Sequence, residues 1–290
     1  MRFIKSVVLS AVFVGFGVGG ASAVAAPPVT SISNPIALQM YTLRNVGTLE
    51  QQLAMAKSAG FRKVEVVGNQ GVTANELKFL LDKYELSVSS SHEQLSTLRN
   101  DLPATIAFNQ AIGNRVLVLP WLEIADRPTD AAGWRKLGAE LDRLGARLRE
   151  YGMKLAYHNH DFEMKKYQDK TAYEWLVSAT KPENLLLEVD VAWVFRGGQD
   201  PARFIRKYAG RLFAIHAKDN SGIGIRDDEM NFAPLGEGLL DWDEIIPTYE
   251  RTDRPLYIVE HDLPKDPLSI ITTARQNLIA ELRAARVASK

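Results

Sequence analysis

Short hydrophobic runs alternate with amphipathic stretches from residue 35 to the end of the chain. Eight of these runs have the length and the β-branched or aliphatic composition of β-strands. They cover residues 36–43, 63–68, 86–92, 115–120, 154–160, 185–191, 212–219 and 256–262. A stretch with helical periodicity follows each run, and this alternation is typical of parallel strands joined by crossover helices.

Helix boundaries are marked by capping residues as well as by periodicity. A Thr followed three residues later by Gln or Glu has the spacing of a capping box, and an Asp before Pro is typical of a first helical turn. These signals occur at Thr48, Thr73, Thr171, Asp200 and Asp266. Over residues 134–148, one tryptophan and four leucines share a helical face, so we expect this helix to cover the sheet.

Eight strand and helix units in about 260 residues match the size of a closed (β/α)8 TIM barrel. A doubly wound open sheet is the alternative arrangement for the same alternation. No linker rich in Pro, Gly or Ser divides the chain after the N-terminal segment. We therefore predict a single α/β domain, a (β/α)8 barrel over residues 27–290.

The N-terminal segment has the layout of a secretory signal peptide. Arg2 and Lys5 precede a short apolar run, and small residues at cleavage-site spacing follow it. The run is shorter than the roughly 20 residues that a membrane span needs. We predict a signal peptide over residues 1–26, cleaved near Ala23 or Ala26, and a periplasmic or secreted protein without a stable membrane span; an uncleaved anchor is the alternative.

Composition narrows the chemistry further. The chain has no cysteine, which excludes a thiol nucleophile and a cysteine-ligated zinc. Without Arg2 and Lys5 the chain carries 33 basic and 35 acidic residues, and this balance argues against a nucleic-acid partner. The expected partner is a small molecule, and the sequence leaves open whether the chain forms a homo-oligomer.

All five histidines fall at the ends of predicted strands, at positions 92, 158, 160, 216 and 261. The carboxyl ends of the strands form the mouth of a TIM barrel, where active sites are built. Residues two apart on a strand share a face. Strands five to eight therefore each offer one pair of polar side chains, with one candidate ligand apiece at His158, Asp190, His216 and Glu260.

Two imidazoles and two carboxylates suit a divalent ion such as Mn²⁺, Zn²⁺, Co²⁺ or Fe²⁺. Mg²⁺ is less favoured because it prefers sites made only of oxygen ligands. Any single histidine at a barrel mouth is more often a hydrogen-bonded polar residue than a ligand. Four candidates from adjacent strands favour a metal site.

The chain resembles the xylose-isomerase-like TIM barrel superfamily, also described as sugar phosphate isomerase/epimerase-like, and within it a group of exported proteins. The segments that carry the resemblance are "IALQMYTLR", "KVEVVG", "YHNHDFE", "EVDVAWVFRGGQDP", "IHAKD", "PLGEGLLDWDEI" and "YIVEHD". The resemblance implies metal ligands of the types Glu, Asp, His and Glu at the ends of strands five to eight. His158 departs from the first of these, which leaves the two-glutamate proton shuttle of family epimerases incomplete.

Further residues receive roles by position or by the resemblance. Many relatives have a histidine where this chain has Trp193, a residue expected either to stack on a sugar ring or to pack under a loop. Lys218 is expected to contact a substrate oxygen, with a surface ion pair to Asp219 as the alternative. Glu65 and Glu188 are inward carboxylates that contact substrate or support the histidines.

These residues predict a metal-dependent enzyme that removes a proton next to a carbonyl of a sugar or sugar derivative. Glu260 or His160 is the expected base, with His92 and Lys218 positioning the substrate. Reprotonation gives isomerisation or epimerisation, whereas loss of a β-substituent makes the protein a lyase or dehydratase acting on a 3-keto-glycoside or keto-sugar. A third hypothesis is a non-catalytic, exported sugar-binding barrel.

Overall fold

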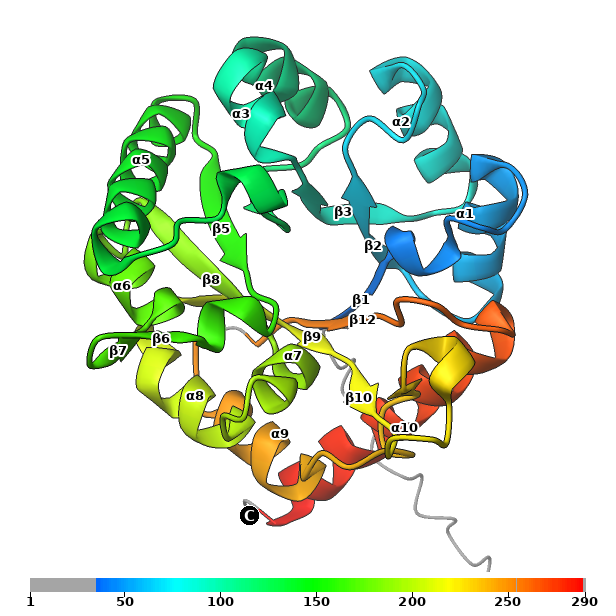
Figure 1. The fold of residues 1–290 in the computed structure, drawn as a ribbon. Coiled ribbons are helices and arrows are strands. Elements are labelled where there is room, and N and C mark those ends of the chain that lie inside the picture. Colours follow the sequence, from blue (N-terminus) through cyan, green and yellow to red (C-terminus); the bar gives the residue numbers. More distant parts are fainter. Residues whose placement is uncertain (1–34, 254, 289–290) are drawn as a thin grey trace, which may run out of the picture. The chain divides into compact units, whose positions relative to one another are not determined.

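The computed structural model describes residues 35–253 and 255–288. The predicted signal peptide, residues 1–26, lies outside these described residues. Within them, eight parallel strands close into a barrel in the order β1-β12-β9-β8-β5-β4-β3-β2, with helices around the outside (Figure 1). The predicted (β/α)8 fold is confirmed, and the open-sheet alternative is wrong.

The barrel strands lie where the hydrophobic runs predicted them. Their bounds are β1 Ile36–Gln39, β2 Lys63–Val67, β3 Ser87–His92, β4 Val116–Leu119, β5 Lys154–His158, β8 Leu185–Asp190, β9 Leu212–Ala217 and β12 Tyr257–Val259. Two short hairpins lie outside the barrel: β6 Lys166–Tyr167 with β7 Lys170–Thr171, and β10 Asp219–Asn220 with β11 Phe232–Ala233.

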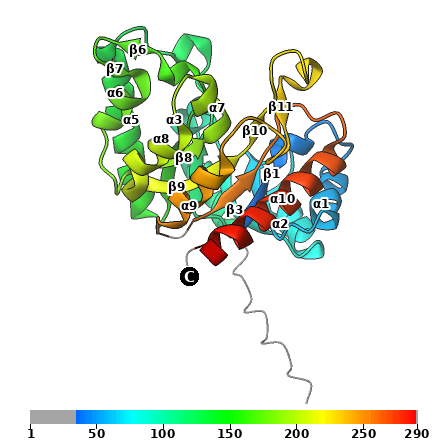
Figure 2. The same ribbon diagram turned by 90° about the horizontal axis from the view of Figure 1, so that it is seen from below.

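The helices cover the barrel from outside, as the view in Figure 2 also shows. They are α1 Leu49–Ser58, α2 Ala74–Lys83, α3 Leu95–Asn100, α4 Leu102–Ala111, α5 Ala131–Glu150, α6 Ala172–Ser178, α7 Val191–Arg196, α8 Pro201–Tyr208, α9 Trp242–Glu250 and α10 Pro267–Ala288. No helix of the described residues combines the length and the apolar character required to cross a membrane.

Local capping chemistry explains where several helices begin. The side chains of Thr48, Thr73 and Thr171 form the predicted capping boxes, and Asp200 and Asp266 accept from backbone N–H groups in their first turns. The apolar face predicted over residues 134–148 is buried in α5. These contacts satisfy N–H groups that a helix leaves free at its start.

Most of the strands end before their hydrophobic runs do, and the difference is largest for β1 and β12. The chain turns into a 3-10 helix directly after β1, where the Gln39 side chain accepts from the Tyr41 N–H. Because β1 is one of the two neighbours of β12, the ladder of β12 also stops, and Glu260 and Asp262 follow the strand instead of lying in it. Both carboxylates thus lie just above the barrel.

The barrel interior changes from apolar to polar along its axis. Small apolar clusters fill the part of the interior that is farther from the mouth, and one of them is formed by Ala37, Ala214 and Ile258. Nearer the mouth the inward side chains are polar. Irregular register follows Val64 in β2 and Leu187 in β8, so Glu65 and Glu188 each lie at a bulge, a feature that re-aims side chains near functional sites.

Candidate metal centre and substrate cavity

The four predicted ligands meet at the barrel mouth. His158 and Asp190 end β5 and β8, His216 lies in β9, and Glu260 follows β12. One ligand atom from each lies within 4.8 Å of the others. All four side chains are buried, with Glu260 the most accessible at 7 % exposed. Two imidazole nitrogens and two carboxylate oxygens at this spacing fit a divalent metal ion.

Glu188 fixes the orientation of both ligand histidines. Its Oε1 lies 3.2 Å from His158 Nδ1 and 2.9 Å from His216 Nε2. In a metal-loaded site an N–H on each of these nitrogens would donate to the carboxylate, and His158 Nε2 and His216 Nδ1 would be the nitrogens left to bind the ion. Those atoms face Asp190 at 3.8 Å and Glu260 at 3.0 Å. A carboxylate behind each ligand histidine is the usual arrangement in metal sites.

A second group of donors is made by His92, His158, Glu188 and His216. It uses the opposite ring nitrogens of the shared histidines, those that Glu188 already contacts. Its one carboxylate, that of Glu188, is fully buried and is not part of the wall of the mouth cavity, whereas Glu260 of the first group reaches that cavity. The first group is therefore the one placed to act on a substrate.

Lys218 lies among three buried carboxylates at the barrel mouth. Its ammonium lies 2.8 Å from Asp190 Oδ2, 2.9 Å from Glu260 Oε2 and 2.8 Å from Asp262 Oδ1, and the residue is 1 % exposed. The suggested ion pair with Asp219 is wrong. Asp219 instead accepts from backbone N–H groups of residues 220, 236, 238 and 240 and from Trp242 Nε1, which fixes the loop after β10.

The cluster around Lys218 carries an excess of negative charge. Three carboxylates surround one ammonium, so the group is suited to receive a divalent cation. Burial opposes charge on Glu260, but Lys218 and His216 hold its pKa well below the usual value. Burial also opposes charge on His216, yet Glu188 and Glu260 hold the pKa of His216 well above its usual value. Glu260 is thus ionised over the physiological range.

A deeper polar layer supports these ligands. Glu65 is fully buried and its Oε1 contacts His216 Nε2 at 2.9 Å and His92 Nε2 at 2.9 Å, while Gln39 donates to it at 2.6 Å. Burial opposes a positive charge on His92, but the neighbouring carboxylates of Glu65 and Glu188 raise the pKa of His92 to about 9. Glu65 is not part of the wall of the mouth cavity, and its contacts fit the support of the histidines that was the other role expected for it.

A cavity of about 460 Å³, here called the mouth cavity, opens above the ligands. Its wall includes His92, His158, His160, Trp193 and Glu260, all of them predicted site residues. His160 lies between two tryptophans, with ring centroids 4.7 Å from Trp121 and 5.1 Å from Trp193. Burial holds the pKa of His160 well below its usual value, so its imidazole is neutral. Aromatic rings around a polar site are suited to bind a sugar ring.

Other residues of the site were missed from the sequence. Asn159 binds the backbone of Asp190, its Oδ1 accepting at 3.1 Å and its Nδ2 donating at 3.3 Å, and so joins β5 to β8. Trp121 follows β4 and forms part of the cavity wall.

Asp190 also caps α7, because its carboxylate accepts from the Trp193 backbone N–H at 3.0 Å. His261, by contrast, is buried beside the backbone of Leu263 and is absent from the cavity wall.

A parallel barrel with a His₂-carboxylate₂ centre at its mouth defines a class of metal-site TIM barrels. Within that class, the chain belongs to the xylose isomerase-like TIM barrel family, whose model matches residues 53–282.

Two relatives and one solved structure are similar to the chain, and the chain spans less than two thirds of the length of the first of these relatives. It is 28 % identical over 192 residues to an inosose dehydratase of Lacticaseibacillus casei, covering 59 % of this chain and 63 % of that protein. It is 24 % identical over 239 residues to the inosose dehydratase of Clostridium beijerinckii, covering 71 % and 79 %. A sugar phosphate isomerase/epimerase from Parabacteroides distasonis superposes with a TM-score of 0.71 at 19 % identity, covering 88 % of this chain and 96 % of that one.

Proposed function

We propose that the protein is a divalent-metal-dependent enzyme that removes a proton from carbon next to a carbonyl of a sugar or sugar derivative. The observation that carries this proposal is the convergence of His158, Asp190, His216 and Glu260 below the mouth cavity, with both histidines oriented by Glu188. Mn²⁺, Zn²⁺, Co²⁺ and Fe²⁺ are the ions that this mixed donor set suits best.

The residues at the mouth divide the work. A metal held by the four ligands supplies Lewis acidity that makes the C–H beside the carbonyl more acidic. Glu260 is ionised and reaches the cavity, so its carboxylate is the first candidate for the base, and the neutral imidazole of His160 is the second. Trp121 and Trp193 offer aromatic faces for a sugar ring, and His92 offers a donor to its hydroxyl groups.

Two outcomes follow the removal of the proton. Return of a proton to carbon gives isomerisation or epimerisation. Elimination breaks the bond from the β-carbon to its oxygen, forms a C=C bond and releases the oxygen as a hydroxyl that takes up the proton. The inosose dehydratase relatives support this second candidate, as does His158, because it replaces one of the two glutamates expected of an epimerase.

The proposed location follows from the N-terminal segment. Residues 1–26 have the charge and hydrophobicity of a signal peptide, which supports a periplasmic or secreted enzyme. Phosphorylated sugars are scarce outside the cytoplasm, so we propose a free, oxidised or glycosidically linked sugar as the substrate.

Proton NMR in D₂O tests the proposed function. The mature, Mn²⁺-loaded protein is incubated with ketoses and 3-keto-glycosides, and deuterium uptake next to the carbonyl is followed. Uptake with a new sugar isomer supports isomerisation or epimerisation, and release of water or of an aglycone supports elimination. Sugar binding without any exchange at carbon would overturn both and favour the non-catalytic barrel.

Glu260→Gln isolates the proposed base. The substitution keeps the shape of the side chain but removes its charge, so turnover should fall to background while weak substrate binding persists. Full activity in this variant would remove Glu260 from the mechanism.

A further inference from the structure

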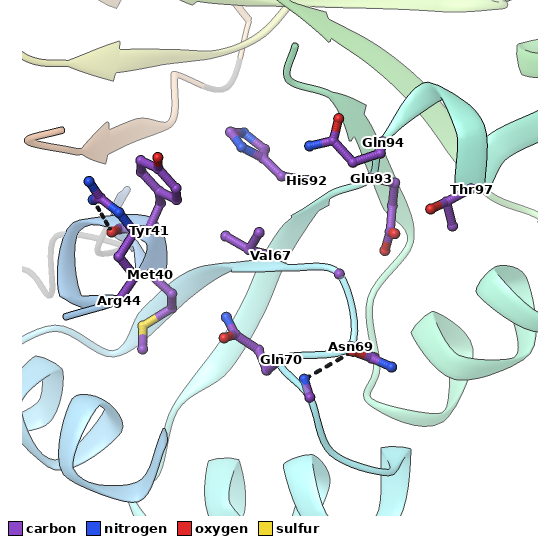
Figure 3. Close-up of a pocket in the computed structure, with 12 residues that line it drawn as sticks. Met40, Tyr41, Arg44, Val67, Asn69, Gln70, His92, Glu93, Gln94 and Thr97 are labelled. Carbon is purple, nitrogen blue, oxygen red and sulfur yellow. Dashed lines mark hydrogen bonds between the residues drawn. The ribbon is translucent and has the colours of Figure 1, made fainter. Parts of the chain in front are cut away.

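A second hollow adjoins the mouth cavity on the side of β1, β2 and β3. This hollow, here called the side lobe, has a volume of about 400 Å³ and lies among the segments that follow those three strands (Figure 3). Tyr41, Arg44, Val67, His92 and Gln94 line both the side lobe and the mouth cavity. Each volume lies within the range of about 300–1,000 Å³ typical of ligand sites.

The side lobe contains none of the four candidate metal ligands. The lining that it does not share with the mouth cavity includes Asn69, Gln70, Glu93 and Thr97. These residues offer amide, carboxylate and hydroxyl groups, which pair with the hydroxyl groups of a sugar. A part of the substrate bound here would therefore be recognised without taking part in the reaction.

The donors and acceptors of the side lobe are only partly used within the protein. The Gln70 amide nitrogen is buried without a hydrogen-bond partner among the described residues. Gln94 stands at the start of α3, yet its side chain does not cap that helix. Glu93 is 4 % exposed, and its Oε1 accepts from Ser91 at 2.8 Å and from Asn109 at 3.1 Å. Buried polar groups without partners call for a ligand or a water.

The turn after β2 holds these groups in a strained conformation. Gln70 has a φ of +56°, between Gly68 at +54° and Gly71 at +74°. A non-glycine residue in the left-handed region is strained, and such strain clusters at ligand sites.

We propose that the substrate is a glycoside of two units, with its keto-sugar ring in the mouth cavity and its second unit in the side lobe. The inference rests on the proposed function, because it takes the mouth cavity as the place of reaction. Two adjoining hollows with a shared wall match two rings joined by a glycosidic bond. Binding energy gained in the side lobe is available to raise kcat/KM for the reaction in the mouth cavity.

Gln70→Ala tests the side lobe. Deuterium exchange next to the ketone is measured for a 3-keto-disaccharide oxidised on its non-reducing unit and for the matching methyl 3-keto-glucoside. Loss of the amide should lower kcat/KM for the disaccharide roughly tenfold, with little change for the methyl glycoside. Thr97→Phe, which fills the lobe from α3, should act in the same direction.

Gln168→Ala is the matched control. Gln168 also has a positive φ, +59°, but lies between β6 and β7 and lines neither the side lobe nor the mouth cavity. The control therefore reports the cost of alanine in a left-handed turn, and both substrates should react with it as with the parent protein.

The outcomes separate the two proposals. An equal effect of Gln70→Ala on both substrates, or no effect, would overturn the two-unit substrate while leaving the proposed function intact. Exchange with ketoses but with neither of these compounds would overturn the two-unit substrate and leave the proposed function intact. If the parent protein exchanges none of the ketoses or 3-keto-glycosides, the proposed function fails, and calorimetric titration with the same 3-keto-disaccharide then tests the side lobe by itself. If the 3-keto-disaccharide binds more weakly to Gln70→Ala than to Gln168→Ala, the result supports the binding of its second unit in the side lobe. Equal binding to the two variants, or no binding, would overturn that proposal.

Discussion

The strand ends of β5, β8, β9 and β12 bury their charged groups in one connected network, whereas the segments after β1, β2 and β3 surround an open lobe with amides and a strained turn. In the first half of the mouth, the Glu188 carboxylate contacts both His158 and His216, and it also reaches His92 at the end of β3. In the second half, the Gln70 amide nitrogen has no partner among the described residues. The difference indicates that one half of the mouth is suited to hold a cation and carry out the reaction, and that the other half is suited to bind the second unit of the substrate.

The largest effect expected in the charged half comes from Asp190→Ala. It removes one ligand, so metal affinity should fall by more than about 100-fold, beyond the loss of about 10–100-fold that removal of an outer partner causes. Turnover should be lost with it. Metal analysis after dialysis and circular dichroism check the result, and unchanged metal content would show that the ligand set is wrong.

Lys218→Met tests whether the charged half is balanced by its lysine. Removal of the ammonium leaves three buried carboxylates without their partner, which should lower the free energy of unfolding by about 3 kcal/mol or more in the metal-free protein. A bound divalent ion offsets this charge, so the loss should be smaller with Mn²⁺ than with EDTA. Urea unfolding with Mn²⁺ and with EDTA measures this loss of unfolding free energy. An equal loss under both conditions would contradict the claim that the ion binds to the same carboxylates as Lys218.

Glu188→Gln tests the orientation of the two histidines. The amide has the same shape but no negative charge, so it holds the two imidazole N–H groups more weakly, and metal affinity should fall about 10–100-fold while the four ligands stay present. Glu163→Gln is the matched control, since Glu163 is also fully buried but contacts the Tyr157 hydroxyl and a backbone N–H instead of an imidazole. Equal losses in the two variants, measured by competition with a chelating dye, would remove the orienting role.

The smallest effect is expected in the recognition half, from Glu93→Gln. Burial raises the pKa of Glu93 from its usual 4.5, against hydrogen bonds from Ser91 and Asn109. The folded protein therefore holds this proton more tightly than the unfolded chain, and the stability that this contributes is present at acidic pH and lost as the pH rises above about 4.5. Urea unfolding from pH 4.5 to 8 should show the parent protein losing stability relative to the variant. A difference that stays constant or grows in favour of the parent would contradict the assignment.

Hydrophobic periodicity predicted all eight barrel strands, and the two-residue repeat of strands brought His158, Asp190, His216 and Glu260 to one place. This succeeded because a barrel forces strand ends together whatever the details of packing. The partners of Lys218 were not predictable, because Glu260 and Asp262 leave β12 and their directions depend on where β1 ends. Asn159 was missed for the same reason, since β5 stops at His158 and the strand pattern no longer applies.

The side lobe could not be predicted from the sequence, for a different reason. Its residues follow β1, β2 and β3 in turns, where side-chain direction depends on backbone conformation instead of a repeat. Gln70 adopts a left-handed conformation, which a sequence ordinarily indicates by glycine, so the residue type did not predict this conformation. The recognition half of such a mouth becomes visible only once the turns are placed.

A crystal structure of the mature protein with Mn²⁺, with anomalous scattering used to locate the ion, tests the central claim most directly. The account predicts one peak bounded by His158 Nε2, Asp190, His216 Nδ1 and Glu260, with Glu188 still contacting the other nitrogen of each histidine. A peak among His92, His158, Glu188 and His216 instead, or no peak at the mouth, would contradict it.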